Sequence, residues 1–308
     1  MSPRPHAPPP PGAAAAAPSS SRWHGQLALR FEAGAVGARL VHNRHAGPLR
    51  LLKALASEDG RRLEAVIVHP PGGMVGGDSL ELEVELGADA RVLATTPGAQ
   101  KWYRGETTAG TCTRIALSAG AFLEWLPQPA ILFDQARARQ SLAIELDPAA
   151  ACVGWEVLVR GRKAMGERIA GGHIDQTLAI SVGRRPLWQE RLHADATDRI
   201  FDSPLGWGGR RIAASVWCCA PGLAPDRLRD LRDRWRWLLD PSPVDAPTPA
   251  SDASGIRGGA TVVTGGLLLA KILADDGERL MSLCQALWRS ARLAVEGDEG
   301  SVPRIWRT

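Results

Sequence analysis

The chain has 308 residues, of which 44% are hydrophobic and 23% are charged. These proportions are those of a folded protein, and they exclude an intrinsically disordered chain and a bundle of membrane helices. Its 37 basic and 33 acidic residues leave a net charge of only +4. Because this excess is small and no clustered basic face stands out, we expect neither a nucleic acid nor a membrane as a partner.

The first 21 residues are rich in proline, alanine and serine and lack the leucine-rich stretch of a secretory signal. We predict that 1–21 is a disordered tail. Five cysteines without a CxxC pair favour reduced thiols and a cytoplasmic protein. The longest apolar run, 261–273, contains Lys271 and is shorter than the roughly 20 residues that a membrane helix needs.

Short runs of alternating or β-branched residues fill the chain from about residue 23 to residue 216. Ser79–Leu86 places apolar side chains on one face and three glutamates on the other, which is the period of a half-buried strand. Similar runs, separated by turn residues, occur at 91–95, 112–117, 122–126, 141–146, 154–159, 177–182 and 186–193. This pattern predicts a long β-rich region.

Two amphipathic helices are predicted after these strands, because apolar residues then recur at steps of three and four. The first covers 225–239 and buries Leu228, Leu231, Trp235 and Leu238. The second covers 277–295 and buries Leu280, Cys284, Leu287, Trp288 and Ala291. Between them, 241–259 is rich in proline, serine and glycine and is predicted to be a flexible loop. Many strands followed by two helices favour a mainly β fold over a doubly wound one.

The densest motif is HPPGGMVGGD at 69–78. Its prolines and glycine pairs build a tight turn that something can approach closely. It is not a phosphate-binding loop of the GxxxxGK[ST] type, because it contains no lysine. His69 and Asp78 are candidate metal ligands, since imidazole suits nickel and a carboxylate can complete its coordination. The alternative is that the motif is only a structural turn.

Two further blocks carry clustered polar side chains. In TTPGAQKWYR, at 95–104, a cluster of side chains binds an anion, anchors an interface, or belongs to a loop pinned to the core by its aromatic rings; the cluster is Lys101, Trp102, Tyr103 and Arg104. GRKAMGE, at 161–167, ends in Glu167 and reads as a charged turn. Glu124 lies between apolar residues, and we interpret it as the outward face of an edge strand rather than as a buried carboxyl group.

Motifs of common enzyme classes are missing from the sequence. It has no GxSxG, no HExxH and no GxGxxG between a strand and a helix. The residues alone therefore give no support for assigning the chain to an enzyme class. A β-rich enzyme that cleaves polysaccharides with paired carboxylates, or a module that binds a small molecule, remain alternatives from other functional classes.

Taken together and in this order, the blocks resemble the urease accessory protein D family, also called UreD or UreH. The resemblance rests on 69–78, on 95–104, on LEWLPQPAILFDQA at 123–136, on 161–167 and on the terminal PRIWRT at 303–308. One departure stands out. The family usually has an acidic residue after LEWLPQ, and here that position is Pro129.

The resemblance implies a fold and a function. The family fold is a long, multi-stranded, layered and β-helix-like domain with two C-terminal helices, here expected over 22–308. Proteins of this family are non-catalytic scaffolds that bind apo-urease and recruit UreF and the GTPase UreG, so that nickel(II) reaches the urease active site. Nickel would be cargo, with no tightly bound cofactor in the chain itself. We place Asp78 and Glu167 on a nickel path as weak oxygen ligands, with His69 as a further candidate.

Overall fold

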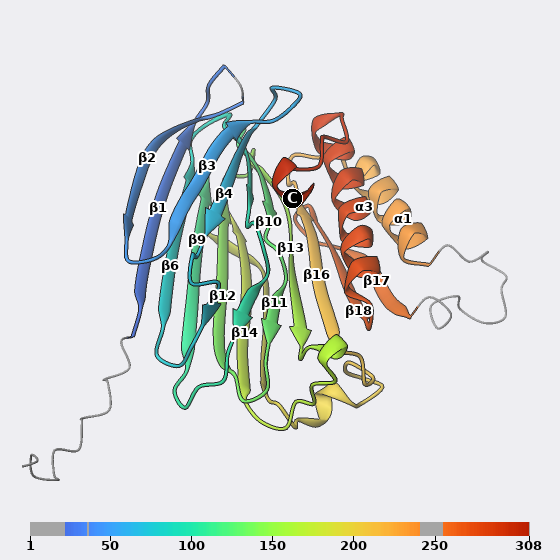
Figure 1. The fold of residues 1–308 in the computed structure, drawn as a ribbon. Coiled ribbons are helices and arrows are strands. Elements are labelled where there is room, and N and C mark those ends of the chain that lie inside the picture. Colours follow the sequence, from blue (N-terminus) through green and yellow to red (C-terminus); the bar gives the residue numbers. More distant parts are fainter. Residues whose placement is uncertain (1–21, 36, 241–254, 308) are drawn as a thin grey trace, which may run out of the picture.

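The computed structural model describes residues 22–35, 37–240 and 255–307, and these form three layers. Two β-sheets pack face to face, and two helices cover the outer face of the second sheet (Figure 1). The mainly β, layered fold is as predicted. The predicted tail at 1–21, and 241–254 of the predicted loop, lie outside the described residues.

The first sheet has seven strands, and their order in space differs from their order along the chain. Across the sheet they are β15 (Arg185–Asp195), β14 (His173–Val182), β12 (Arg137–Leu146), β9 (Ala109–Leu117), β6 (Ser79–Leu86), β1 (His24–Glu32) and β2 (Arg39–Ala46). The five strands from β14 to β1 run parallel to one another, whereas β15 and β2 are antiparallel edges.

The second sheet continues this pattern. Across it lie β17 (Ile256–Val263), β18 (Leu267–Ala274), β16 (Ile212–Cys219), β13 (Ala151–Arg160), β10 (Phe122–Leu126), β7 (Arg91–Thr95), β4 (Leu63–Val68) and β3 (Arg50–Ala56). Three short strands extend one end of it: β5 (Gly73–Met74), β8 (Gln100–Trp102) and β11 (Ala130–Leu132). The strands β4, β7, β10 and β13 are parallel.

The chain winds between the two sheets as a flattened coil, from β4 to β6, β7, β9, β10, β12, β13 and β14 in turn. This is the predicted β-helix-like arrangement. The turns that lead from the first sheet to the second are short, at 87–90, 118–121 and 147–150. The loops that lead from the second sheet back to the first are longer, and they hold the motif blocks.

The alternating strand pattern is confirmed. In β6 the side chains of Leu80, Leu82, Val84 and Leu86 are buried between the sheets. The strands β6, β7 and β10 match their predicted bounds residue for residue, and the remaining predicted runs lie inside longer strands. Period-two burial therefore identifies the sheet faces, while hydrogen bonding extends some strands beyond the apolar run.

Both predicted helices are present. The helix α1 spans Pro225–Leu239 and buries Leu228, Leu231 and Trp235, as predicted, together with Leu239; Leu238 is only partly buried. The helix α3 spans Gly277–Glu296, begins after Asp276, whose carboxylate accepts two backbone N–H bonds, and ends at Gly297 with φ +83°. Every residue of its predicted stripe is buried against the second sheet. No helix in the described part of the chain is long and apolar enough to cross a membrane.

One loop boundary predicted from sequence is wrong. The last four residues of the predicted loop, from Ile256 to Gly259, belong to strand β17. Their glycines favour a loop locally, but Ile256 pairs with Ala274 of β18 and packs under the helices. A side chain at Gly258 would meet Leu239 Cδ2 at 2.9 Å, so the glycine lets α1 lie close to this strand.

Candidate functional site

The motif blocks lie together at one end of the coil, because each follows a neighbouring parallel strand of the second sheet. The blocks at 69–78 and 161–167 begin directly after β4 and β13, while those at 95–104 and 123–136 begin within β7 and β10 and continue into the loops that follow. Backbone hydrogen bonds join them in sequence: Tyr103 N to Met74 O at 2.8 Å, Phe133 N to Trp102 O at 3.0 Å, and Gly161 N to Leu132 O at 2.7 Å. Segments that are about 30 residues apart in the sequence thus form one continuous surface, called the motif end below.

Asp78 closes the first of these loops. Its carboxylate accepts hydrogen bonds from Val75 N at 2.9 Å and Trp23 N at 3.0 Å, and the residue is 4% exposed. One oxygen therefore stabilises the turn, as in the alternative interpretation of the motif, and the other ties the turn to the residue before β1. This geometry fixes the path of the chain into β6.

Glu167 holds two neighbouring loops together. Its carboxylate accepts hydrogen bonds from Arg162 N at 2.9 Å, Arg162 Nε at 3.0 Å and Asp134 N at 3.2 Å. The hydrogen bond from the Arg162 side chain keeps the pKa of Glu167 below its usual range, so the group is ionised at neutral pH. The guanidinium group of Arg162 also lies 4.2 Å from the Phe133 ring.

His69 differs from both carboxylates, because neither of its ring nitrogens has a hydrogen-bond partner, although both atoms are buried. Burial lowers the pKa of His69, and the negative charge of Asp78 opposes this shift only in part. The imidazole is therefore neutral at pH 7, which is the form that binds metals. Within the described residues, no group of three or more His, Cys, Asp or Glu side chains is placed to hold a metal ion.

His69 lines a cavity of about 370 Å³ between the two sheets. Apolar residues such as Leu82 and Trp125 form much of the wall, and the polar groups include Lys101, Gln140 and Glu156. The cavity begins at the motif end, where the loops after β4, β7 and β10 contribute to it. It is large enough to hold several water molecules or a hydrated ion.

Glu156 is a buried acid in this cavity that the sequence analysis missed. Burial raises its pKa to about 8, and the nearby charge of Glu190 adds to this effect. Gln140 Nε2 donates to Glu156 Oε1 at 2.9 Å from the opposite sheet. The available signal was the single acid in the long apolar strand Ala151–Arg160, where period two places it on the inter-sheet face.

The predicted interface block divides into two parts. Trp102 is 1% exposed and lies in the core, and Tyr103 packs edge-on against Phe133 with ring centroids 5.0 Å apart. These rings pin the loop to the molecule. Lys101 and Arg104 are exposed, so they are the residues of this block that can meet a partner.

Glu124 is not on an exposed edge, and our interpretation from the sequence is wrong. Its strand, β10, lies in the middle of the second sheet, and the side chain is fully buried beneath α3. Trp288 Nε1 donates to Glu124 Oε1 at 2.7 Å, and Arg292 Nη1 donates to Oε2 at 2.7 Å. Arg62 Nε lies 3.5 Å from the same carboxylate. The lone acid in the apolar strand Phe122–Leu126 was the signal for this burial.

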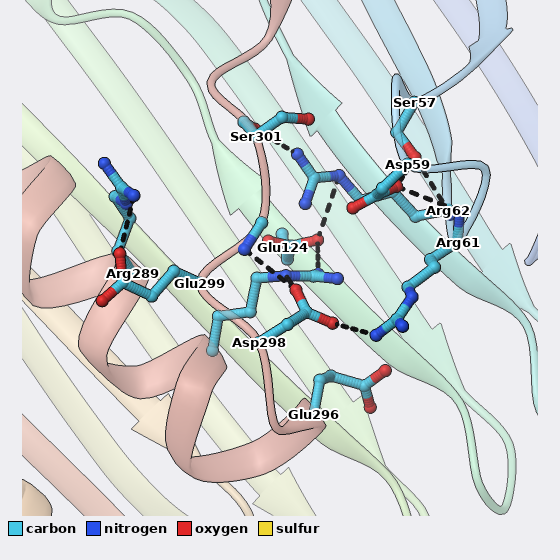
Figure 2. Close-up of polar contacts among 12 residues, drawn as sticks. Ser57, Asp59, Arg61, Arg62, Glu124, Arg289, Glu296, Asp298, Glu299 and Ser301 are labelled. Atoms are coloured by element: carbon cyan, nitrogen blue, oxygen red, sulfur yellow. Dashed lines mark hydrogen bonds and ion pairs between the residues drawn. The ribbon is translucent and has the colours of Figure 1, made fainter.

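Figure 2 shows where the partners of Glu124 come from. Arg61 and Arg62 approach from the loop before β4, while Asp298 and Ser301 approach from the segment after α3. Burial raises the pKa of Glu124, and the two guanidinium groups and the indole N–H oppose that rise. The cluster ties together three parts of the chain that are far apart in sequence.

Comparison with known proteins places the whole described chain in one family. The family model described as UreD urease accessory protein matches residues 24–307. A protein of Pseudomonas aeruginosa named urease accessory protein UreD is 40% identical over 287 residues, which cover 93% of this chain and 95% of that protein. The protein of that name from Dechloromonas aromatica is 35% identical over 291 residues, 94% of this chain and 96% of its own length. The chain therefore belongs to the UreD family of urease accessory proteins.

Proposed function

We propose that this chain is a urease maturation factor without catalytic activity of its own. It binds apo-urease and recruits UreF and the GTPase UreG in the cytoplasm, and nickel(II) is its cargo. The observation that carries the proposal is the family match over 24–307, supported by relatives named urease accessory proteins along nearly their full length. The motif blocks that match the family also share one end of the coil.

The inter-sheet cavity supports passage of nickel through the chain. A carrier needs ligands that release the ion, and scattered oxygen and single imidazole ligands hold nickel less firmly than thiolate clusters. His69 offers free ring nitrogens at the motif end. Glu156 offers a carboxyl group farther along the same cavity that is mostly protonated at neutral pH. An ion would thus meet single ligands, one after another.

Asp78 and Glu167 remain predicted ligands of this path. Each already accepts hydrogen bonds, so nickel binding would require the exchange of a hydrogen bond for a metal contact. Asp78→Ala and Glu167→Ala separate the two roles. Assembly of the complex with reduced nickel in urease supports a ligand role, whereas nickel lost in proportion to assembly indicates that the carboxylate only stabilises its loop.

A blocked cavity provides the direct test of passage. Thr113 lines the cavity, while the next residue, Arg114, points to the outer face of the same strand. We expect Thr113→Phe to lower the nickel content of urease while the complex still assembles, and Arg114→Phe to leave both unchanged. Normal nickel with Thr113→Phe would exclude the cavity as the route.

Partner binding is tested separately. A tagged copy of the chain should retain urease subunits, UreF and UreG during purification. Lys101→Glu and Arg104→Glu should weaken retention of one of them, because these exposed cations flank the pinned rings of the motif end. Glu106→Lys, on the same exposed loop, is the matched control. A chain that purifies without any of these proteins would contradict the scaffold role.

A further inference from the structure

The C-terminal segment contacts the wall of the cavity from the side that faces the helices. Trp306, in the short helix η3 (Arg304–Arg307), donates its indole N–H to Thr95 Oγ1 at 2.9 Å. Its ring lies between two others, with centroids 5.8 Å from Trp155 and 6.1 Å from Trp288. Thr95 is the last residue of β7, so the contact is made where the loop that lines the cavity begins.

The hydroxyl group of Thr95 links Trp306 to the neighbouring strand, β10. It donates to Leu126 O at 2.6 Å, at the end of β10. The loops that follow the two strands are joined as well, since Gln128 N donates to Thr96 Oγ1 at 2.9 Å. Thr96, Pro97, Pro127 and Gln128 all line the cavity. The indole of Trp306 therefore supports the inner wall through one threonine.

Trp155 makes a parallel connection. Its indole donates to Pro127 O at 2.7 Å, and its ring contacts Trp306 on the side away from the cavity. The indole groups of Trp306 and Trp155 thus form hydrogen bonds with Thr95 and Pro127, two adjacent points of the same wall. Trp306 belongs to the C-terminal segment, and Trp155 packs against it. This arrangement fixes the position of the loops after β7 and β10.

The C-terminal segment is itself anchored at several points. Asp298 accepts from Arg292 Nε at 2.9 Å and Arg61 Nη1 at 2.9 Å, and Ser301 O accepts from Arg62. Arg304 Nε donates to Glu58 Oε1 at 3.1 Å. The hydrogen bonds and ion pairs of this segment therefore position Trp306 next to Thr95.

We propose that Trp306 is a positioning residue for the cavity, which sets the width of its entrance by holding the loops after β7 and β10 through Thr95. The proposal rests on the proposed passage of nickel through this cavity, but the position of the wall can be measured without nickel. Trp306 touches no cavity space itself, so its effect on passage is exerted through Thr95 and Trp155.

Two variants remove the hydrogen bond between Trp306 and Thr95, and one of them, Thr95→Val, does so with little change in volume. Trp306→Phe keeps an aromatic ring and loses the donor, and Thr95→Val keeps the shape and loses the hydroxyl. Trp237→Phe, at a tryptophan 54% exposed on α1, is the matched control. The reporter is Gln128→Cys in the wall, labelled with a maleimide in a Cys112→Ser background, because Cys112 is the half-exposed native thiol.

We expect both variants to label about 2- to 10-fold faster than the control, which is the effect of one lost hydrogen bond on the open population. In the assembled maturation complex they should also lower nickel per urease while the yield of complex stays constant. Labelling at the rate of the control, or nickel lost only in proportion to complex, would overturn the proposal. If Thr113→Phe leaves nickel delivery unchanged, the passage fails, and the labelling rates still decide whether Trp306 sets the wall.

Discussion

Two buried glutamates on neighbouring strands differ in their surroundings, although both are nearly inaccessible to solvent. Glu124 on β10 faces the helices, and Glu156 on β13 faces the opposite sheet. Glu124 lies against two guanidinium groups and an indole donor. Glu156 has two glutamines, Gln140 and Gln176, as hydrogen-bond partners, with Glu190 as a nearby like charge and Lys271 as a nearby cation.

The difference shows that a glutamate can stabilise the fold on one face of a sheet and remain able to exchange its proton on the other. A carboxylate that is matched by two cations binds distant segments together, but it offers no free oxygen. A carboxyl group with few partners keeps its proton and can exchange it for a passing cation. The helix side thus holds a carboxylate fixed by charged partners, and the inter-sheet side holds a carboxyl group that keeps its proton at neutral pH.

The largest expected effect is on the helix side. Glu124→Ala removes the one buried carboxylate that Arg62 and Arg292 share and leaves them only Glu64 and Asp298 as counter-charges, so we expect a loss of about 3 kcal/mol in the free energy of unfolding. Urea denaturation measures it. Glu83→Ala is the control, because the exposed pair of Glu83 with Arg114 contributes about 0–1 kcal/mol. Equal losses in the two variants would show that the buried cluster is not a stabilising centre.

A smaller loss is expected when only one partner of Glu124 is changed. Trp288→Phe removes the N–H donor at 2.7 Å and leaves both arginines in place. A hydrogen bond to a charged group contributes about 1.5–3 kcal/mol, and this is the expected loss in unfolding free energy. Trp237→Phe on the exposed face of α1 should cost much less. The reverse order would contradict the comparison.

How far the sequence predicts this molecule depends on the range of the interactions. Ser79–Leu86 and Pro225–Leu239 are predicted residue for residue, because their burial follows a period set by the local backbone. Glu124 is misplaced, because its partners Arg62 and Arg292 lie 62 residues before it and 168 residues after it in the chain. No local pattern records such a pairing.

The candidate site shows the same limit. The motif blocks are recognisable from their residues, but their meeting at one end requires the coil of parallel strands. The cavity and Glu156 follow from the spacing of the two sheets, which period and composition do not contain. Asp78 and His69 belong to one motif, yet only the structure shows that one is hydrogen-bonded and the other is free.

On the cavity side, we expect Glu156→Gln to be about as stable as the wild type near pH 4.5, and to be more stable by roughly 1–3 kcal/mol at pH 7, where only the unfolded wild type has released the proton. The folded state keeps a proton that the unfolded state releases above its pKa of about 4.5. The wild type should therefore lose stability relative to the variant as pH rises from about 4.5 through about 8. Unfolding measured at pH 5, 7 and 9 tests this, and a difference that is constant with pH would contradict it.

The smallest expected effect on stability concerns His69. Two buried ring nitrogens without partners cost free energy, and a leucine of similar volume removes that cost. We expect His69→Leu to leave the unfolding free energy unchanged or to raise it by up to roughly 1 kcal/mol. If the imidazole is a nickel ligand on the path, the same variant lowers the nickel content of urease without lowering the yield of complex. A less stable variant that delivers nickel normally would instead make His69 a structural residue, and it would remove the contrast between the two faces of the sheet at this point.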